Sequence, residues 1–90
     1  MGARIRIHPL LQDLAHGQEI VEVEGKNVGE CLADLEKKFP GMDEFIFERK
    51  GKLLQNVEIF INGKTVSSNE LAASVKDGDE ISILMLLSGG

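Results

Sequence analysis

The carboxyl end of the chain carries its most distinctive chemistry. Gly89 and Gly90 follow Ser88 as the last residues. Because glycine has no Cβ, such an end can enter a narrow channel and adopt strained dihedral angles, and its terminal carboxylate is unhindered. A carboxylate is a poor electrophile until one of its oxygens becomes a leaving group, and adenylation achieves this. The diglycine end therefore indicates an acyl group that an ATP-using partner could activate.

Two acidic side chains have the spacing of a possible catalytic pair. Glu30 and Asp34 lie four residues apart, which places them on one face of a helix. Asp34 also precedes Lys38 by four residues, the spacing of an exposed ion pair. We interpret these charges as an ordinary solvated helix face. The sequence contains no Ser-His-Asp arrangement and no phosphate-binding loop, so it does not indicate an enzyme that works alone.

The cysteine and the histidines give little support to a nucleophile or a metal site. Cys31 falls on the apolar stripe of a predicted helix, so we interpret it as a buried apolar side chain. A single cysteine cannot form an internal disulfide, a four-thiolate zinc site or an iron–sulfur site. His8 and His16 have no third ligand at metal spacing, so no metal site is predicted.

Composition limits the chain to one small acidic domain. It has 90 residues, 42% of them hydrophobic, and a formal net charge of −5. The acidic balance argues against nucleic acid and against an anionic membrane surface as partners, because both attract clustered Lys and Arg. No apolar run approaches the ~20 residues of a membrane span, and residues 1–9 lack the apolar core of a signal peptide. We therefore expect a cytoplasmic protein.

Four segments have the composition or alternation of β-strands. The first two and the third alternate apolar and polar residues, and the last is rich in apolar and β-branched residues. The predicted strands are 3–8, 18–24, 57–61 and 80–87. Asn62-Gly63 and residues 77–79 are typical of tight turns next to these strands.

One main helix is predicted between the second and third strands. Asn27 is a good N-cap with Glu30 at capping-box spacing, and an apolar stripe runs from Val28 to Phe39. A short helical turn is expected after Asn69. Residues 42–55 show no clear period, so we expect an irregular, partly buried stretch with an exposed turn.

This order of elements predicts an α+β domain with the helix on one face of the sheet. If the last strand runs beside the first, the two must be parallel, because the helix supplies the crossover. The expected folded domain spans residues 1–87, and residues 88–90 are expected to form a flexible tail.

The last strand carries large apolar side chains on both of its faces. By alternation Ile83 points toward the core, whereas Leu84 and Leu86 point outward beside the tail. Phe60 also falls on the outer phase of its strand. We interpret Leu84, Leu86 and Phe60 as a partner-binding surface, because grouped exposed apolar side chains mark interaction sites. The alternative is that residues 42–55 cover this outer face.

With these motifs the chain resembles the MoaD/ThiS group of sulfur carriers, small proteins with the ubiquitin-like β-grasp fold. The resemblance covers essentially the whole chain. The matching segments are Gly51-Lys52-Leu53-Leu54, residues 57–63 (VEIFING), residues 77–84 (DGDEISIL) and Ser88-Gly89-Gly90. It implies a mixed sheet of four to five strands with one helix on one face. The chain length and residues 51–53 are most similar to those of the carriers of cysteine biosynthesis. They are next most similar to those of the small subunit of molybdopterin synthase.

The resemblance implies a carrier that is not itself an enzyme. A ubiquitin-activating-like adenylyltransferase with ATP and Mg would adenylate the Gly90 carboxylate, and sulfur would displace AMP to give a thiocarboxylate. A sulfur-acceptor enzyme, cysteine-synthase-like or the large subunit of molybdopterin synthase, would then take the sulfur. The carrier itself would bind no cofactor. Leu84 matches an outward apolar residue that family members use against partners. Family members often have a proline near residues 85–86. This chain has none there, so the resemblance does not identify which enzyme accepts the sulfur.

Two other functions remain open at this point. A ubiquitin-like modifier would share the fold and the adenylation but would join Gly90 to lysines of target proteins. A plain interaction module with an inert tail would use the fold alone. A β-grasp ferredoxin is excluded, because one cysteine cannot hold its cluster.

Overall fold

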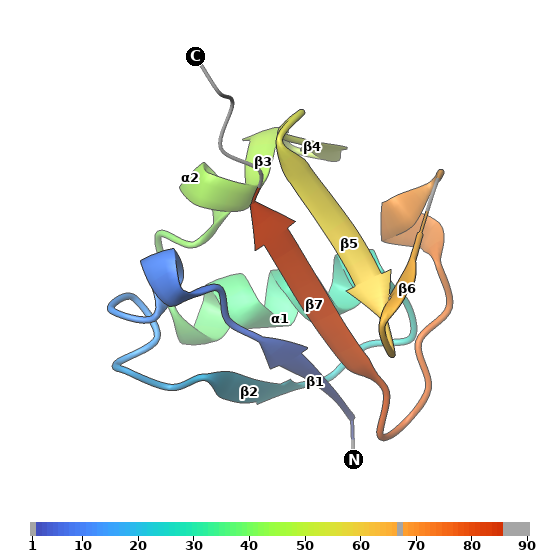
Figure 1. Cartoon of the computed structure of the whole chain (residues 1–90), viewed down its shortest axis with the longest axis horizontal. Coiled ribbons are helices and arrows are strands. Elements are labelled where there is room, and N and C mark those ends of the chain that lie inside the picture. The colour runs from blue at the N-terminus through green and yellow to red at the C-terminus, as the bar shows by residue number, and fades with distance from the viewer. Residues whose placement is uncertain (1, 67, 86–90) are drawn as a thin grey trace.

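The computed structural model describes residues 2–66 and 68–85 (Figure 1). Its elements in chain order are β1 (Ala3–Arg6), η1 (Pro9–Leu11), β2 (Ile20–Val23), α1 (Val28–Lys38), α2 (Asp43–Ile46), β3 (Phe47–Arg49), β4 (Lys52–Leu53), β5 (Val57–Ile61), β6 (Lys64–Thr65), η2 (Glu70–Ala72) and β7 (Glu80–Met85). The predicted tail residues Ser88, Gly89 and Gly90, together with Leu86 and the expected domain boundary after residue 87, lie outside the described residues.

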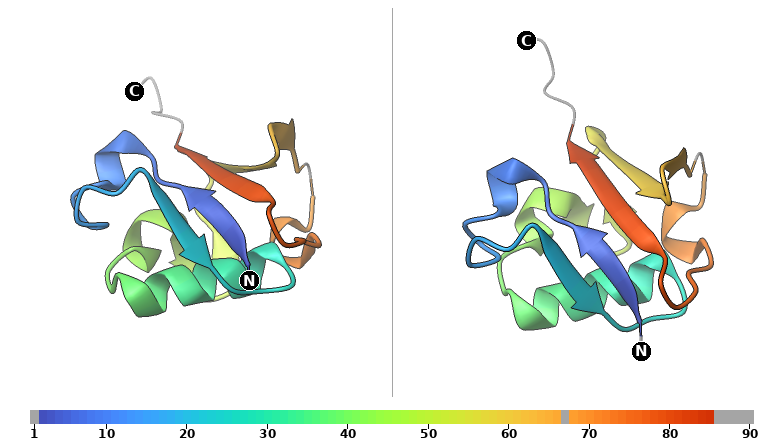
Figure 2. Two further views of the ribbon diagram at one scale, coloured as in Figure 1. Left: turned by 90° about the horizontal axis from the view of Figure 1, so that it is seen from below. Right: turned by 60° about the horizontal axis from the view of Figure 1, so that its bottom comes forward.

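Five strands form one mixed sheet in the order β2-β1-β7-β5-β6, and β3 and β4 form a separate hairpin. β1 runs parallel to β7 and antiparallel to β2, and β7 runs antiparallel to β5. Helix α1 covers one face of this sheet (Figures 1 and 2). The predicted α+β fold is therefore confirmed, including the parallel pairing of the first and last strands.

The core fills the layer between α1 and the sheet. Ile5, Ile59 and Ile81 are fully buried on the central strands, because alternate residues of each strand face the helix. The helix contributes its apolar stripe of Val28, Cys31, Leu32 and Leu35. Burying one such large aliphatic side chain stabilises the fold by about 1.5–3 kcal/mol. This layer therefore holds the fully buried side chains of the central strands.

Helix α1 begins at the predicted residue. The Asn27 side chain accepts a hydrogen bond from Glu30 N at 2.8 Å, as an N-cap does. The Glu30 carboxylate accepts from Lys26 N at 2.9 Å, one residue before the partner that a capping box uses. With 11 residues α1 is too short to cross a bilayer, and within the described ranges no other helix has the length and apolar character to do so.

The prediction for residues 42–55 was wrong in one respect: the stretch is partly buried with an exposed turn at residues 50–51, as expected, but it is not irregular. It contains the four-residue helix α2 and the hairpin of β3 and β4, with Met42 and Ile46 fully buried. The Glu36 carboxylate accepts hydrogen bonds from Gly41 N and Asp43 N and so joins α2 to the end of α1. Elements of two to four residues are too short for a period to show in the sequence.

A hydrogen-bonded clamp joins the turn after β5 to the turn before β7. Asn62 adopts a left-handed φ of 52° and Gly63 a φ of 83°, as the predicted tight turn requires. The Asn62 amide donates to Asp79 Oδ1 at 2.9 Å, and its oxygen accepts from Glu80 N at 2.9 Å. Hydrogen bonds from Lys76 N and from Asn62 lower the pKa of Asp79. The clamp therefore sets where β7 starts.

We expect Asn62→Ala to lower the free energy of unfolding by about 1–3 kcal/mol, because it removes two hydrogen bonds and places alanine in a left-handed conformation. Asn69→Ala is the matched control, since Asn69 has a φ of 50° and its side chain makes no capping hydrogen bond. Urea unfolding of both variants measures the difference. Equal losses would show that the clamp adds nothing beyond backbone strain.

Candidate functional site

Strand β7 leads the chain out of the middle of the sheet. It pairs with β1 on one side and with β5 on the other, where Val57 lies opposite Met85. Five residues follow Met85 in the sequence. Five residues span at most about 18 Å when extended, so a partner that acts on Gly90, as the sequence predicts, would have to come close to this end of the sheet.

Two of the predicted outward residues, Leu84 and Phe60, share one face of the sheet. The Leu84 side chain is 39% exposed, whereas its neighbour Ile83 is 5% exposed, so the predicted phase of the strand is confirmed. Leu84 and the half-buried Phe60 line a shallow apolar groove of about 250 Å³ together with Pro9. Residues 42–55 do not cover it. The partner role of Leu84, Phe60 and Leu86 stays a prediction.

Paired charges lie on the same face, farther from the end of β7. The Arg6 guanidinium Nε donates to Glu80 Oε2 at 3.0 Å, and this contact raises the pKa of Arg6. Arg6 lies beside Ser82 in the sheet, and Ser82 lies beside Phe60. The outer face therefore carries an ion pair near the start of β7 and an exposed leucine, Leu84, near its end, where Glu58 lies beside Leu84.

Cys31 has the environment of a structural residue. Its side chain is fully buried against the sheet, and burial raises the pKa of its thiol, with a smaller contribution from Glu30, Asp34 and Glu24. A thiol that stays protonated is a weak nucleophile. The structure thus favours the buried interpretation over a catalytic one.

The other residues considered for chemistry have structural partners. Asp34 accepts from Glu24 N at 2.9 Å and from Lys38 Nζ at 2.7 Å, and these contacts lower its pKa. His8 Nδ1 accepts from Leu10 N at 3.1 Å, and the His16 ring packs edge-on against Phe39. Across residues 2–66 and 68–85 no group of three or more His, Cys, Asp and Glu side chains is arranged to hold a metal ion.

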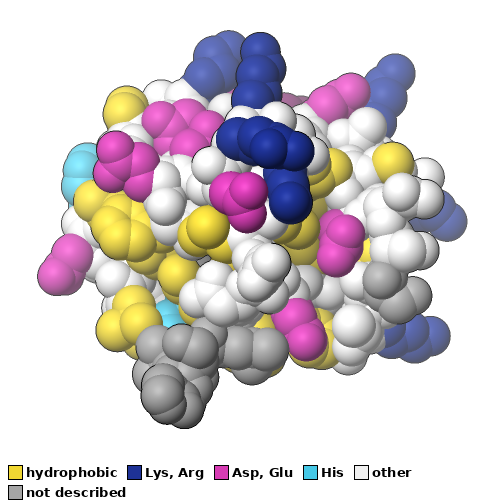
Figure 3. Space-filling model, turned by 90° about the horizontal axis from the view of Figure 1, so that it is seen from above, with side chains coloured by type: hydrophobic (Ala, Val, Ile, Leu, Met, Phe, Trp, Pro, Cys, Tyr) yellow, Lys and Arg dark blue, Asp and Glu magenta, His cyan; other side chains and the backbone are white. Residues whose placement is uncertain are grey.

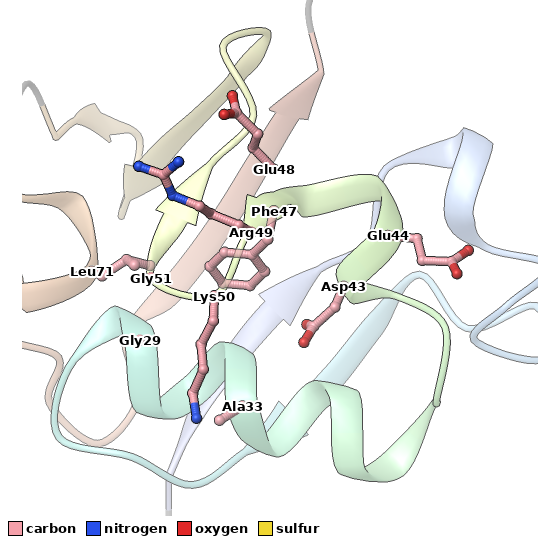
Figure 4. A pocket seen from close by; sticks show the side chains of 10 residues that line it. All are labelled: Gly29, Ala33, Asp43, Glu44, Phe47, Glu48, Arg49, Lys50, Gly51 and Leu71. Carbon is pink, nitrogen blue, oxygen red and sulfur yellow. The ribbon is translucent and has the colours of Figure 1, made fainter.

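A second groove, of about 800 Å³, lies between α1 and the β3–β4 hairpin (Figure 4). The Phe47 ring projects into it, and Lys50 and Asp43 point toward α1 from either side of that ring. Asp43 Oδ1 is buried without a hydrogen-bond partner, and burial, with the nearby Glu36 charge, raises the pKa of Asp43. Sequence reasoning missed this groove because the hairpin that forms one wall was not predicted.

Comparison with known proteins agrees with this geometry. The model of the ThiS family matches residues 5–90. The sulfur carrier protein CysO of Mycobacterium tuberculosis is 32% identical over 93 residues, which cover all of both chains.

Solved structures show the same architecture. A chain from the crystal structure of the Amycolatopsis orientalis BexX/CysO complex matches with a TM-score of 0.88 and 30% identity, over 99% of this chain and 100% of that one. The solution structure of small archaeal modifier protein 1 from Methanosarcina acetivorans matches with a TM-score of 0.84 and 29% identity, over 98% and 95% of the two chains. The fold is thus the ubiquitin-like β-grasp.

We expect Cys31→Ala to lower the free energy of unfolding by about 1–2 kcal/mol, because it leaves a small cavity in the core. In the native wild-type protein we expect the thiol to react with a disulfide reagent only as fast as the protein opens. Labelling rates with and without urea measure this. Rapid labelling of the native protein would contradict the buried, protonated thiol.

Proposed function

Because the chain belongs to the ThiS family, we propose that it is a sulfur carrier that transports sulfur on the carboxyl group of Gly90. The observation that carries this proposal is the family match over residues 5–90, which extends through the strand β7 to the terminal glycine. The exit of β7 beside an apolar groove supports it, since an enzyme acting on the tail needs a surface to dock on.

The chemistry we propose takes place in partner enzymes. The partner binds ATP with Mg. A Gly90 carboxylate oxygen attacks the α-phosphorus of this ATP, and pyrophosphate leaves. A sulfide sulfur then attacks the acyl carbon and AMP leaves, which gives the thiocarboxylate. If the donor is a persulfide, its attack on the acyl carbon gives an acyl disulfide and releases AMP. A second thiol of the donor then attacks the donor sulfur of this acyl disulfide, which releases the thiocarboxylate and leaves a disulfide between the two donor sulfurs. The carrier supplies reach and a docking surface and needs no catalytic group.

Two partners follow from this sequence of steps. One is a ubiquitin-activating-like adenylyltransferase, and the other is a sulfur-acceptor enzyme that is cysteine-synthase-like or the large subunit of molybdopterin synthase. The similarity to CysO favours the first kind of acceptor. The BexX/CysO complex supports the idea that relatives of this chain dock as whole folded domains. We place the reaction in the cytoplasm, where ATP is available.

A second candidate function is a protein modifier. The similarity to small archaeal modifier protein 1 favours it, although CysO matches at a higher TM-score. In this case a lysine amine of a target protein attacks the Gly90 adenylate, AMP leaves and an isopeptide bond forms. Mass spectrometry of cell extracts separates the two: exchange of one oxygen for sulfur at Gly90 supports the carrier, and Gly90 joined to lysine supports the modifier.

Deleting Gly90, or adding one residue after it, should abolish activation and leave the fold intact, because the reacting carboxylate is lost or displaced while β7 is unchanged. ATP–pyrophosphate exchange with the activating enzyme measures activation, and thermal unfolding checks the fold. Full exchange by the shortened protein would refute the role of Gly90.

Leu84→Glu should weaken binding to the activating enzyme by roughly tenfold or more, since it places a charge in an apolar contact. Its free energy of unfolding should fall by only about 1 kcal/mol, because Leu84 is partly exposed and Glu58 lies opposite it. Ile83→Glu is the neighbouring control and should unfold the domain, since Ile83 is buried. If Leu84→Glu unfolds the protein as well, Leu84 belongs to the core.

A further inference from the structure

The described part of the chain exposes four large apolar side chains, which are Leu10 at 63% exposed, Phe45 at 42%, Leu84 at 39% and Ile20 at 36%. Ile20 lies beside Arg6 in the sheet, away from the end of β7, whereas the elements that carry the other three lie toward that end. We call Leu10, Phe45 and Leu84 the apolar collar. Large exposed apolar groups scattered singly are ordinary, but a group gathered at one end marks an interaction surface.

The topology of the sheet brings two of these residues toward the same end. β1 and β7 are parallel, and β1 ends at Arg6 beside Ser82, so the chain that follows β1 continues along the second half of β7. Leu10 lies in η1 of that following segment, and its neighbour Pro9 lines the same groove as Leu84.

Helix α2 brings the third residue toward this end. Leu54 N donates to Ile46 O, which ties α2 to the chain just before β5, and β5 begins opposite Met85. Figure 1 shows α2 beside the carboxyl end of β7, and Figure 3 looks down on this end, where apolar patches alternate with charged side chains. Helix α2, which carries the exposed Phe45, therefore lies near the end of β7.

The opposite end of the molecule has a different surface. A groove there is lined by Gly2, Gly78 and four charged residues, which are Arg4, Glu22, Glu24 and Asp77. Among the described residues this end exposes no large apolar side chain. The asymmetry indicates that a partner approaches along the direction of β7.

We propose that the enzyme that adenylates Gly90 covers the apolar collar, so that Phe45 and Leu10 contact it as well as the Leu84 groove. This inference rests on the proposed function. The length of the chain beyond β7 identifies the occupant: five residues reach at most about 18 Å from Met85, so an enzyme holding Gly90 in its active site must lie against this end.

The collar would surround the tail on more than one side. Leu84 and Phe60 lie on the outer face of the sheet, Leu10 lies on η1, and Phe45 lies on α2. Contacts on several sides of the chain exit fix the direction in which the tail enters the enzyme, whereas a contact on the sheet face alone leaves the domain free to tilt. Phe45 is the strongest candidate for a main contact, since buried aromatic groups dominate the energetics of interfaces.

The test is steady-state ATP–pyrophosphate exchange with the purified activating enzyme of the same organism, with the carrier as varied substrate. Phe45→Ser and Leu10→Ser should each raise the KM for the carrier by about five- to tenfold and leave kcat unchanged, because the truncated side chains contribute to docking and not to the reaction. Glu22→Ser, an exposed change at the opposite end, is the control and should leave KM unchanged. Thermal unfolding confirms that the variants are folded.

The outcomes separate this inference from the function on which it rests. If the wild-type chain supports no exchange with that enzyme, the proposed function fails and the collar fails with it. If the wild-type chain is active and both folded collar variants match the control in KM, the collar alone is overturned. If sedimentation shows that the free chain dimerises and Phe45→Ser abolishes the dimer, a second copy occupies the collar and the proposal is again overturned.

Discussion

The parallel pairing of β1 with β7 is the constraint on which the rest of the structure depends. It places Ile5 beside Ile81, and both side chains are fully buried under α1. A parallel pair needs a long crossover, and here the chain between the two strands supplies α1 and the whole second half of the sheet. The last strand therefore becomes the central strand, with neighbours on both sides, although it is the last element to be synthesised.

A central last strand gives the carboxyl end a rigid base. The ladder to β5 runs from Glu80 N near the Asn62 clamp to Met85 opposite Val57, and β1 holds the first half of the strand from the other side. Such a strand does not fray in the way that an edge strand or an unpaired terminus does. The direction of the chain up to Met85 is thus fixed by main-chain hydrogen bonds.

Much of this architecture could be predicted from the sequence, and the failures have physical causes. Alternation around Ile81 and Leu84 gave the correct faces of β7, and Asn27 and Asn62 marked a helix start and a tight turn through their own side-chain chemistry. Residues 42–55 could not be read, because α2 is held by the Glu36 carboxylate and by burial of Met42, contacts that depend on the tertiary fold. The exposed position of Phe45 was not predicted either, because Phe45 belongs to α2.

The two faces of the sheet differ in how deeply their apolar side chains are buried. The fully buried Ile5, Ile59 and Ile81 face α1, whereas Leu84 on the outer face stays partly exposed. The buried layer also contains the one cysteine, which matters for the proposed chemistry. An acyl adenylate reacts with thiolates, and a reactive thiol on the carrier would compete with the sulfur donor for its own activated end. In the proposed carrier, burial of Cys31 with a raised thiol pKa would suppress that side reaction.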